Sequence, residues 1–247
     1  MKVKLINYSQ GTGEFESDTA LDLIAFCARV SNPSNQNNKE TSEKLVKYLI
    51  KHKHWSPLEM VSACMEIETT RDIARQILRH RSFSFQEFSQ RYADPGSLDD
   101  TFVVRDARLQ DEKNRQNSVE NTNLALAAWW EERQKRVIKE AEEAYAWAIE
   151  NGIAKEQARK VLPEGITKTR LYMKGSLRSW LHYIELRSAN GTQKEHMDIG
   201  KGDCQKKYKI FSWALLSRIP CLVLKTSKRT FFDFDLSRLF IFLTWLW

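Results

Sequence analysis

Residues 61–69 alternate apolar and polar side chains without interruption, which restricts this segment to one kind of structure. A period of two predicts a β-strand with one face buried and the other exposed. Directly afterwards, residues 71–81 change to the three- and four-residue spacing of a helix, and Arg71, Arg75 and Arg79 form a stripe along one side. The chain therefore joins a half-buried strand to a helix that carries a cationic stripe.

Periodicity and the signals for caps and turns predict the remaining elements. A long helix extends over about residues 119–151, rich in Ala, Glu, Lys and Arg, and Gly152 ends it. The other predicted strands and helices are shorter, and no internal repeat is present. Strands are predicted at 3–6, 102–104 and 166–173, and helices at about 18–30, 45–50, 155–162 and after the pair Gly175-Ser176.

The composition is that of an ordinary globular protein, with 42% hydrophobic and 29% charged residues in a chain of 247. Its formal charge of +7 favours anionic partners. Such partners include nucleic acid, a membrane surface and small molecules that carry phosphate. Charge alone does not choose among these three classes.

The four cysteines are scattered without Cys-x-x-Cys spacing, so they suggest neither a zinc knuckle nor a disulfide framework. We therefore expect a reduced, cytoplasmic setting. The N-terminus lacks the apolar stretch of a secretory signal. The apolar run at 239–247 is much shorter than the ~20 residues of a membrane-spanning helix, so no membrane segment is expected.

Arg79, His80 and Arg81 stand together at the predicted end of the arginine-striped helix. Three consecutive side chains point in different directions, so at least one must turn inward, where an unpaired charge is costly. A guanidinium group in a cleft needs an anion, and its planar fork suits phosphate. A solvated helix face is the competing interpretation of the stripe. The three consecutive residues favour a phosphate site.

Downstream of this triplet, Phe83, Phe85 and Phe88 alternate with hydroxyl, amide and carboxylate side chains. Such interleaving can line a pocket that stacks a flat ring and hydrogen-bonds its edge. An edge strand with a buried apolar face would produce the same alternation. The flanking Arg79 and Arg91 favour the pocket.

Seven residues separate the triplet 79–81 from Ser89, which forms a Ser-x-Arg pair with Arg91. This spacing resembles the signature segment of the flavin-dependent thymidylate synthases. Three further segments are similar to motifs of the same family: His-Trp-Ser-Pro-Leu-Glu at 54–59, Ala-Arg-Lys-Val-Leu-Pro at 158–163, and the helix at 176–187. The resemblance covers about residues 1–200, which predicts a catalytic domain there and a divergent C-terminal segment over 201–247.

The resemblance implies an α+β subunit of one catalytic domain, with a central, mostly antiparallel sheet flanked by helices, one of them long. It also implies a homotetramer whose active sites are shared between subunits. FAD would be the cofactor, dUMP the substrate, and methylene-tetrahydrofolate and NADPH the co-substrates. The positions that match flavin-binding residues are His54, Ser56, Arg79, His80, Arg81, Glu87, Arg178 and His182. Those that match dUMP-binding residues are Gln76, Arg79, Glu87, Phe88, Ser89, Gln90, Arg91, Arg159 and Arg187.

The implied reaction is reductive methylation of uracil C5, a poor nucleophile until electron density enters the ring. An arginine held against the N3 edge and its neighbouring carbonyl would favour the enolate-like form, and Arg187 is predicted to take this catalytic role. Ser89 is the second predicted catalytic position, as a hydroxyl that positions the substrate. A nucleophilic serine needs an adjacent base, and the sequence does not reveal whether His80 reaches it. No cysteine lies in a matched motif, which argues against a thiol mechanism.

Other signals in the sequence are weaker. His52 and His54 are not predicted to bind a metal, because two histidines at this spacing on a helix end do not share a face and no third ligand is apparent. The segment 11–13 lacks the third glycine of a dinucleotide-binding fingerprint, and a P-loop is absent, so side chains and helix ends would hold the flavin. The stretch 193–196 is assigned a structural or rim role.

A basic nucleic-acid-binding protein is the alternative function. The charge of +7, eight tryptophans and seven tyrosines could serve phosphate contacts and base stacking. Against this, the basic residues are dispersed along the chain and no nucleic-acid-binding signature stands out. We therefore expect no nucleic-acid partner.

Overall fold

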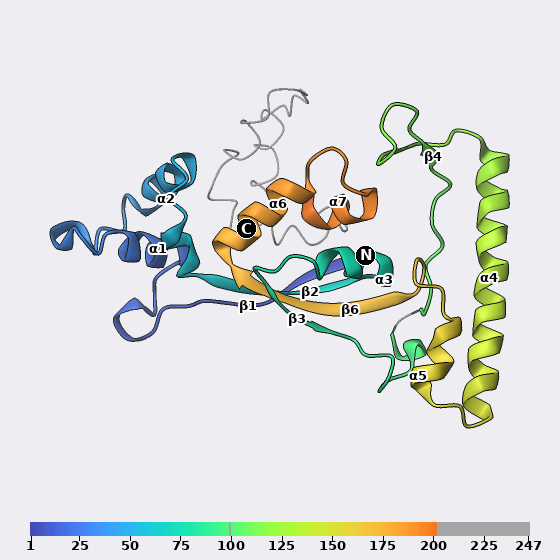
Figure 1. Ribbon diagram of the computed structural model, residues 1–247. Helices are drawn as coiled ribbons and strands as arrows, with labels where there is room; N and C mark the ends of the chain where they lie inside the picture. Colours follow the sequence, from blue (N-terminus) through green and yellow to red (C-terminus); the bar gives the residue numbers. More distant parts are fainter. Residues whose placement is uncertain (99, 202–247) are drawn as a thin grey trace, which may run out of the picture.

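A four-stranded antiparallel sheet forms the centre of the computed structural model, which describes residues 1–98 and 100–201. The strands follow one another across the sheet in the order β1 (Lys2–Tyr8), β2 (Ser62–Thr70), β6 (Lys168–Ser176) and β3 (Ser84–Glu87). β2 and β6 pair along their whole length. Figure 1 shows helices above this sheet and a long helix that stands beside it.

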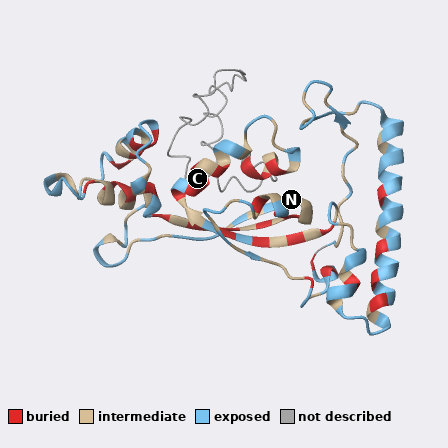
Figure 2. Cartoon of the chain, viewed as in Figure 1, coloured by how far each residue is buried: buried red, intermediate tan, exposed pale blue. Residues whose placement is uncertain are grey.

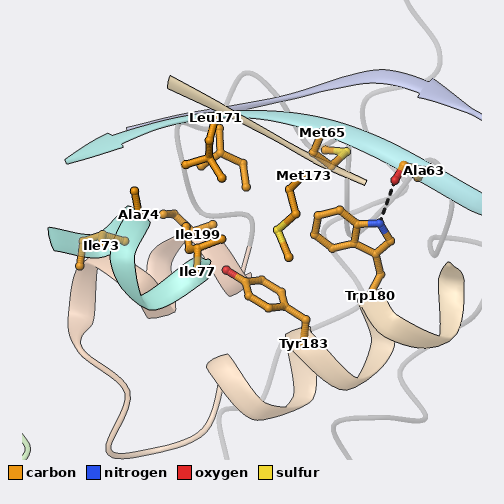
Figure 3. Close-up of a cluster of buried hydrophobic side chains, with 11 residues drawn as sticks. Ala63, Met65, Ile73, Ala74, Ile77, Leu171, Met173, Trp180, Tyr183 and Ile199 are labelled. Carbon is orange, nitrogen blue, oxygen red and sulfur yellow. Dashed lines mark hydrogen bonds between the residues drawn. The ribbon is translucent and has the colours of Figure 1, made fainter. Parts of the chain in front are cut away.

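The alternation in residues 61–69 appears in the structure as alternating burial along β2. The apolar members of this segment are at most 1% exposed, whereas Glu66 faces the other way and accepts a hydrogen bond from the hydroxyl of Tyr172. Three helices cover the buried face and enclose the principal core (Figure 3). They are α3 (Arg71–Ile77), α6 (Leu177–Arg187) and α7 (Lys194–Lys201). The predicted half-buried strand is confirmed.

A second core lies at one end of the sheet, where α1 (Ala20–Ala28) and α2 (Ser42–Lys51) pack together (left in Figure 1). Helix α1 begins at a capping box in which Thr19 and Asp22 each accept from the other's backbone N–H. The short 3-10 helix η3 (Ser56–Glu59) closes this core with a fully buried leucine. Both predicted N-terminal helices are therefore present.

Helix α4 (Leu124–Glu150) stands apart from the sheet, and α5 (Lys155–Ala158) and the 3-10 helix η5 (Arg159–Val161) pack against its C-terminal end. Most of its surface is exposed (Figure 2). Gly152 follows it with a positive φ of 74°, a conformation that glycine adopts without strain. The predicted glycine stop is confirmed. The buried residues of α4 are Gln134, Ala141, Tyr145 and Ala148.

Four predicted elements differ from the structure, and one of them is the helix predicted at 155–162, which is divided into α5 and the 3-10 helix η5. Residues 102–104 form no strand, because only Phe102 pairs, in an isolated bridge to Thr167. The helix predicted over 71–81 ends at Ile77, because the backbone N–H groups of Arg79 and His80 bond to carbonyls three residues back instead of four. The long helix begins at Leu124 rather than near 119. The residues before it include β5 (Ser118–Val119), which pairs with β4 (Leu109–Gln110).

The predicted fold class is confirmed: the chain is α+β, with a central antiparallel sheet flanked by helices. Within residues 1–98 and 100–201, no helix is both long and apolar enough to cross a membrane. The divergent segment predicted for 201–247 lies outside the described residues from position 202 onwards.

Candidate functional site

Helix α6 carries predicted site residues at both of its ends. It begins at Ser176, whose hydroxyl accepts from the backbone N–H of Ser179 at 3.2 Å. Arg178 and His182, four residues apart, share one side near its N-terminus. Arg187 is its last residue and lies about 13 Å farther along the axis than Arg178, at 1.5 Å per residue. The two ends therefore form separate environments.

The middle of α6 is fixed by both cores. Leu177 and Leu181 enter the second core, whereas Trp180 and Tyr183 enter the principal one. The indole Nε1 of Trp180 also donates to the backbone carbonyl of Ala63 in β2 at 3.1 Å. Because the helix is anchored on two sides, the positions of its ends follow from its packing.

At the C-terminal end of α6, Arg187 is held by His80 of the signature segment. Nε of Arg187 donates to Nε2 of His80 at 2.9 Å. Burial, with a smaller contribution from the charge of Arg187, lowers the pKa of His80 from 6.5 to about 4. The imidazole is therefore neutral near pH 7 and can accept this hydrogen bond. Within the described residues, no hydrogen bond or ion pair engages the terminal nitrogens of Arg187.

A buried polar network lies behind this pair. His196 of α7 is 0% exposed; its Nε2 is 2.9 Å from the Tyr183 hydroxyl oxygen, and its Nδ1 is 3.2 Å from Oε1 of Gln76. Nε2 of Gln76 donates to Oε1 of Gln193 at 2.7 Å. Burial, helped by the charge of Arg187, lowers the pKa of His196 to about 3, and burial raises that of Tyr183. Both rings are therefore neutral near pH 7.

The N-terminal end of α6 is more open. Nη1 of Arg178 donates to Oε1 of Glu59 at 2.7 Å. Hydrogen bonds from Ser176 and then from Arg178 lower the pKa of Glu59. The ring of His182 lies edge-on to that of Trp55, with 4.5 Å between the ring centroids. Two more predicted flavin contacts are exposed in the stretch 54–59: His54 and Ser56.

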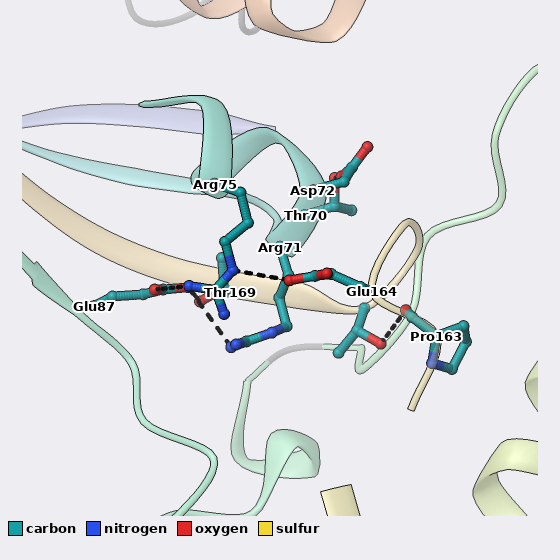
Figure 4. Close-up of polar contacts among 9 residues, drawn as sticks. Thr70, Arg71, Asp72, Arg75, Glu87, Pro163, Glu164 and Thr169 are labelled. Carbon is teal, nitrogen blue, oxygen red and sulfur yellow. Dashed lines mark hydrogen bonds and ion pairs between the residues drawn. The ribbon is translucent and has the colours of Figure 1, made fainter. Parts of the chain in front are cut away.

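Glu87, at the end of β3, lies among arginines from α3 (Figure 4). Its Oε1 is 3.6 Å from Nη1 of Arg71 and accepts from the Thr169 hydroxyl at 3.0 Å, while its Oε2 is 3.6 Å from Nη1 of Arg75. Nε of Arg75 also pairs with Oε1 of Glu164 at 2.8 Å. The side chains of Arg71 and Glu87 are only 12% and 15% exposed. Glu87 is thus held in place by its own chain.

Positive charge remains in excess around Glu87. Burial lowers the pKa of Arg71, Glu87 raises it, and the charges of Arg75 and Arg159 lower it again. A guanidinium nevertheless stays charged in proteins. Three arginines therefore face two glutamates, and the predicted dUMP contact Arg159 belongs to this cluster.

The residues that follow β3 include the remaining predicted dUMP contacts. The backbone N–H of Phe88 donates to the carbonyl of Arg170 at 2.8 Å, which extends the pairing with β6. The hydroxyl of Ser89 accepts from the backbone N–H of Arg91 at 3.4 Å, and no histidine bonds to it within the described residues. Gln90 is 3% exposed, and its Nε2 has no hydrogen-bond partner in the part of the chain that is described.

Three arginines of the signature segment are exposed: Arg79, Arg81 and Arg91. Arg91 makes a long ion pair, with 3.7 Å between its Nε and Oε2 of Glu156. The side chains of the other two make neither a hydrogen bond nor an ion pair with residues 1–98 or 100–201. None of the three points into the core.

The phenylalanines of this segment serve the fold. Phe83 and Phe85 pack against the principal core, and β3 is an edge strand. A Cβ at Gly175 of β6 would lie only 2.4 Å from Cδ1 of Phe83, so the close approach of these two segments requires glycine. For Phe83 and Phe85, the edge-strand interpretation is therefore the right one.

Comparison with known proteins identifies the family. The family described as thymidylate synthase complementing protein matches residues 14–207. A probable flavin-dependent thymidylate synthase of Paramecium bursaria Chlorella virus 1 is 50% identical over 199 residues, which cover 81% of this chain and 90% of that relative. The chain belongs to the flavin-dependent thymidylate synthases. Another member, from Synechocystis sp., is 50% identical over 177 residues, or 72% of this chain and 79% of its own length.

A solved structure of similar fold supports this family assignment. The UMP/dUMP methylase PolB from Streptomyces cacaoi, crystallised with 5-Br dUMP, superposes with a TM-score of 0.68 at 26% sequence identity. The match covers 81% of this chain and 86% of the PolB chain. The likeness therefore extends over most of the chain and is not confined to the signature segment.

This chain brings together only part of each predicted set. Gln76, His80 and Arg187 meet at the C-terminal end of α6. Arg178 and His182 lie at the other end, and Glu87 is held in the arginine cluster. Within the described residues, no group of histidine, cysteine and carboxylate side chains could hold a metal.

Several residues that complete these groups have no site role predicted from the sequence. Tyr183 and His196 belong to the network behind Arg187, Glu59 fixes Arg178, and Glu164 pairs with Arg75. Glu59 could have been found, because it is the glutamate of the His-Trp-Ser-Pro-Leu-Glu segment. His196 could not, because its burial depends on how α7 packs against α3 and α6.

Proposed function

We propose that this enzyme converts dUMP to dTMP by reductive methylation, with FAD as cofactor, methylene-tetrahydrofolate as one-carbon donor and NADPH as reductant. The observation that carries the proposal is the pair at the end of α6. Neutral His80 accepts from Nε of Arg187 at 2.9 Å and leaves the terminal guanidinium nitrogens for a ligand. A fixed cation with unused donors is suited to stabilise negative charge on a uracil ring.

Other predicted site residues fit ligands that carry phosphate. Arg79 and Arg81 are exposed cations whose side chains have no partner among the described residues, and the arginine cluster around Glu87 has surplus positive charge. Gln90 keeps a buried, unpaired amide nitrogen. Arginines bind phosphate bidentately, and a buried donor without a partner is costly until a ligand satisfies it.

The flavin and the nucleotide have different suggested holders. Ser56, Arg178 and His182, with His54, His80 and Arg81, would hold FAD, which supplies the hydride-transfer chemistry between NADPH and the methylene group delivered to C5. Gln76, Arg159 and Arg187 would hold dUMP, together with Glu87, Phe88, Ser89, Gln90 and Arg91. Arg79 and Glu87 belong to both predicted sets. The similarity to PolB, which was crystallised with 5-Br dUMP, supports the binding of a nucleotide by this fold.

Within this proposal, each residue has one task. Arg187 would stabilise the enolate-like uracil, and neutral His80 would hold Arg187 without competing for its charge. Ser89 would position the substrate, since its hydroxyl bonds to the Arg91 backbone rather than to a base. A serine without a base is a poor nucleophile at neutral pH.

We also propose a homotetramer with shared sites. Helix α4 exposes large apolar side chains along a helix of 27 residues, among them Trp129 at 68%, Trp147 at 61% and Val137 at 52%. Extended apolar surface of this kind marks protein contacts. A second subunit would also bring exposed cations such as Arg79 and Arg81 to a site that one subunit leaves incomplete.

The test is a spectrum of the purified protein before and after NADPH, with and without dUMP, combined with a dTMP assay and light scattering. We expect yellow protein with the mass of four chains, bleaching by NADPH, and dTMP only when dUMP and methylene-tetrahydrofolate are both present. Colourless protein that cannot be reconstituted with FAD, but shifts DNA in a salt-dependent way, would instead support the nucleic-acid alternative.

A further inference from the structure

His196 is a fully buried histidine with a hydrogen-bond partner at each ring nitrogen, and the proposed chemistry assigns it no role. It comes from α7, while its partners come from α6 and α3: the Tyr183 hydroxyl at 2.9 Å and Oε1 of Gln76 at 3.2 Å. A neutral imidazole donates through one nitrogen and accepts through the other. The ring therefore links two helices in a defined direction.

The hydrogen-bond partners of His196 determine which ring nitrogen donates and which accepts. Oε1 of Gln76 can only accept, so Nδ1 of His196 carries the proton and Nε2 accepts from the Tyr183 hydroxyl. If Gln76 were turned over, its amino group would donate to Nδ1 and His196 would donate to the Tyr183 oxygen. The hydroxyl proton of Tyr183, which is 2% exposed, would then have no acceptor among the described residues. An unpaired buried donor is costly, so the first arrangement is favoured.

The same direction determines what Gln76 presents to a ligand. Its carbonyl is turned toward buried His196, while its amino group lies on the exposed side and donates to Gln193 at 2.7 Å. An amide nitrogen has two N–H groups, so one remains for another acceptor. Gln76 therefore offers an unused amide N–H on the side away from His196.

We infer that His196 is a positioning residue for nucleotide binding: it fixes the side-chain amide of Gln76 so that the amino group meets an acceptor oxygen of dUMP. The inference rests on the proposed function, in which Gln76 contacts dUMP. The imidazole itself touches neither substrate nor cofactor. Tyr183 sets which ring nitrogen carries the proton, and His196 transmits that choice to Gln76.

The experiment measures the Kd of dUMP for the FAD-loaded enzyme by calorimetry, with the KM for dUMP alongside. His196→Leu fills a similar volume but leaves the Gln76 carbonyl without its donor, and we expect dUMP binding about tenfold weaker. His196→Asn keeps an N–H near the position of Nδ1 and should restore dUMP affinity to within about twofold of the original.

Two further variants separate positioning from packing. Ile199→Ala removes buried volume from the same helix, and we expect a lower melting temperature with unchanged dUMP affinity. Gln76→Glu still accepts from His196 but has lost the donor, so adding His196→Leu to it should weaken binding little further. Weaker dUMP binding in Ile199→Ala equal to that in His196→Leu would overturn the inference, as would unchanged binding in His196→Leu.

Failure of the proposed function would give a different result from failure of the inference about His196. If the unaltered enzyme binds dUMP and FAD but forms no dTMP, the proposed reaction is wrong while the Kd series still tests His196. If it does not bind dUMP at all, both proposals fail together, and no variant is needed to show it.

Discussion

The two ends of α6 carry arginines in opposite circumstances. Arg187, at the C-terminal end, donates a hydrogen bond to neutral His80. The buried network of His196 and Tyr183 lies behind this pair. Arg178, at the N-terminal end, is exposed, and among residues 1–98 and 100–201 its partner is the exposed Glu59. One arginine of this helix is thus fixed by buried neighbours, and the other is exposed to solvent.

This difference indicates how the work of the site is divided. A preorganised cation reorganises little when charge develops beside it, which is what catalysis needs. An exposed cation can still move to meet a ligand and exchange its surface partner for a phosphate. We therefore expect changes at the Arg187 end to affect turnover, and changes at the Arg178 end to affect cofactor retention.

Replacing Arg187 should have the largest effect. Arg187→Ala removes the cation proposed to stabilise the enolate-like uracil, and we expect dTMP formation to fall by about 10²–10³. Bound FAD and NADPH oxidation should persist, because the other end of α6 is unchanged. An assay of dTMP beside NADPH consumption measures both. Glu185→Ala, an exposed change on the same turn, serves as the control, and an undiminished dTMP yield in Arg187→Ala would remove Arg187 from catalysis.

Replacing Arg178 should give the complementary result. Arg178→Ala is expected to weaken FAD binding about 10- to 100-fold, the usual contribution of a hydrogen bond between charged groups. Turnover at saturating FAD should change much less. Fluorescence titration of the apoprotein with FAD measures the affinity, and Lys174→Ala removes an exposed cation from the neighbouring strand as the matched control. Equal losses of FAD affinity in both variants would mean that only net charge matters.

The two ends of α6 have fixed positions only if the helix is rigidly anchored to the sheet. Trp180→Phe removes the hydrogen bond from Nε1 to the Ala63 carbonyl at 3.1 Å and some buried volume. We expect a loss of about 1–3 kcal/mol in the free energy of unfolding, measured in urea. Both dTMP formation and FAD retention should then fall modestly and together. A selective loss of one of them would break the view of α6 as a single support.

The last expected effect is on the pH dependence of stability. His80 and His196 have folded-state pKa values of about 4 and about 3, whereas unfolded histidines titrate near 6.5. The unfolded chain therefore binds more protons below pH 6.5, and stability is lost as the pH falls toward 4. Thermal melts between about pH 7 and pH 5 should show this decline, which His196→Asn should reduce. An identical slope in that variant would contradict a buried neutral His196.

The sequence predicted correctly the features that depend only on residues adjacent in the chain. Alternation in residues 61–69 predicted the buried face of β2, and Gly152 predicted the end of α4, because side-chain period and backbone conformation are local properties. The spacing of Arg79 to Arg91 identified the family. The same local patterns gave a strand at 102–104 that the structure lacks, since a strand also needs a partner along its length.

Tertiary structure alone decided which of the many arginines are held and which are free. Arg178 and Arg187 are equally plausible anion ligands in the sequence, yet only the fold brings His80, in the turn after α3, to Arg187. Burial of His196, and with it the orientation of Gln76, likewise depends on three helices meeting. The sequence by itself determined the family, the strand and helix pattern and the residue types of the site. The division of the site into a fixed end and an open end required the fold, because charge burial depends on neighbours distant in the chain.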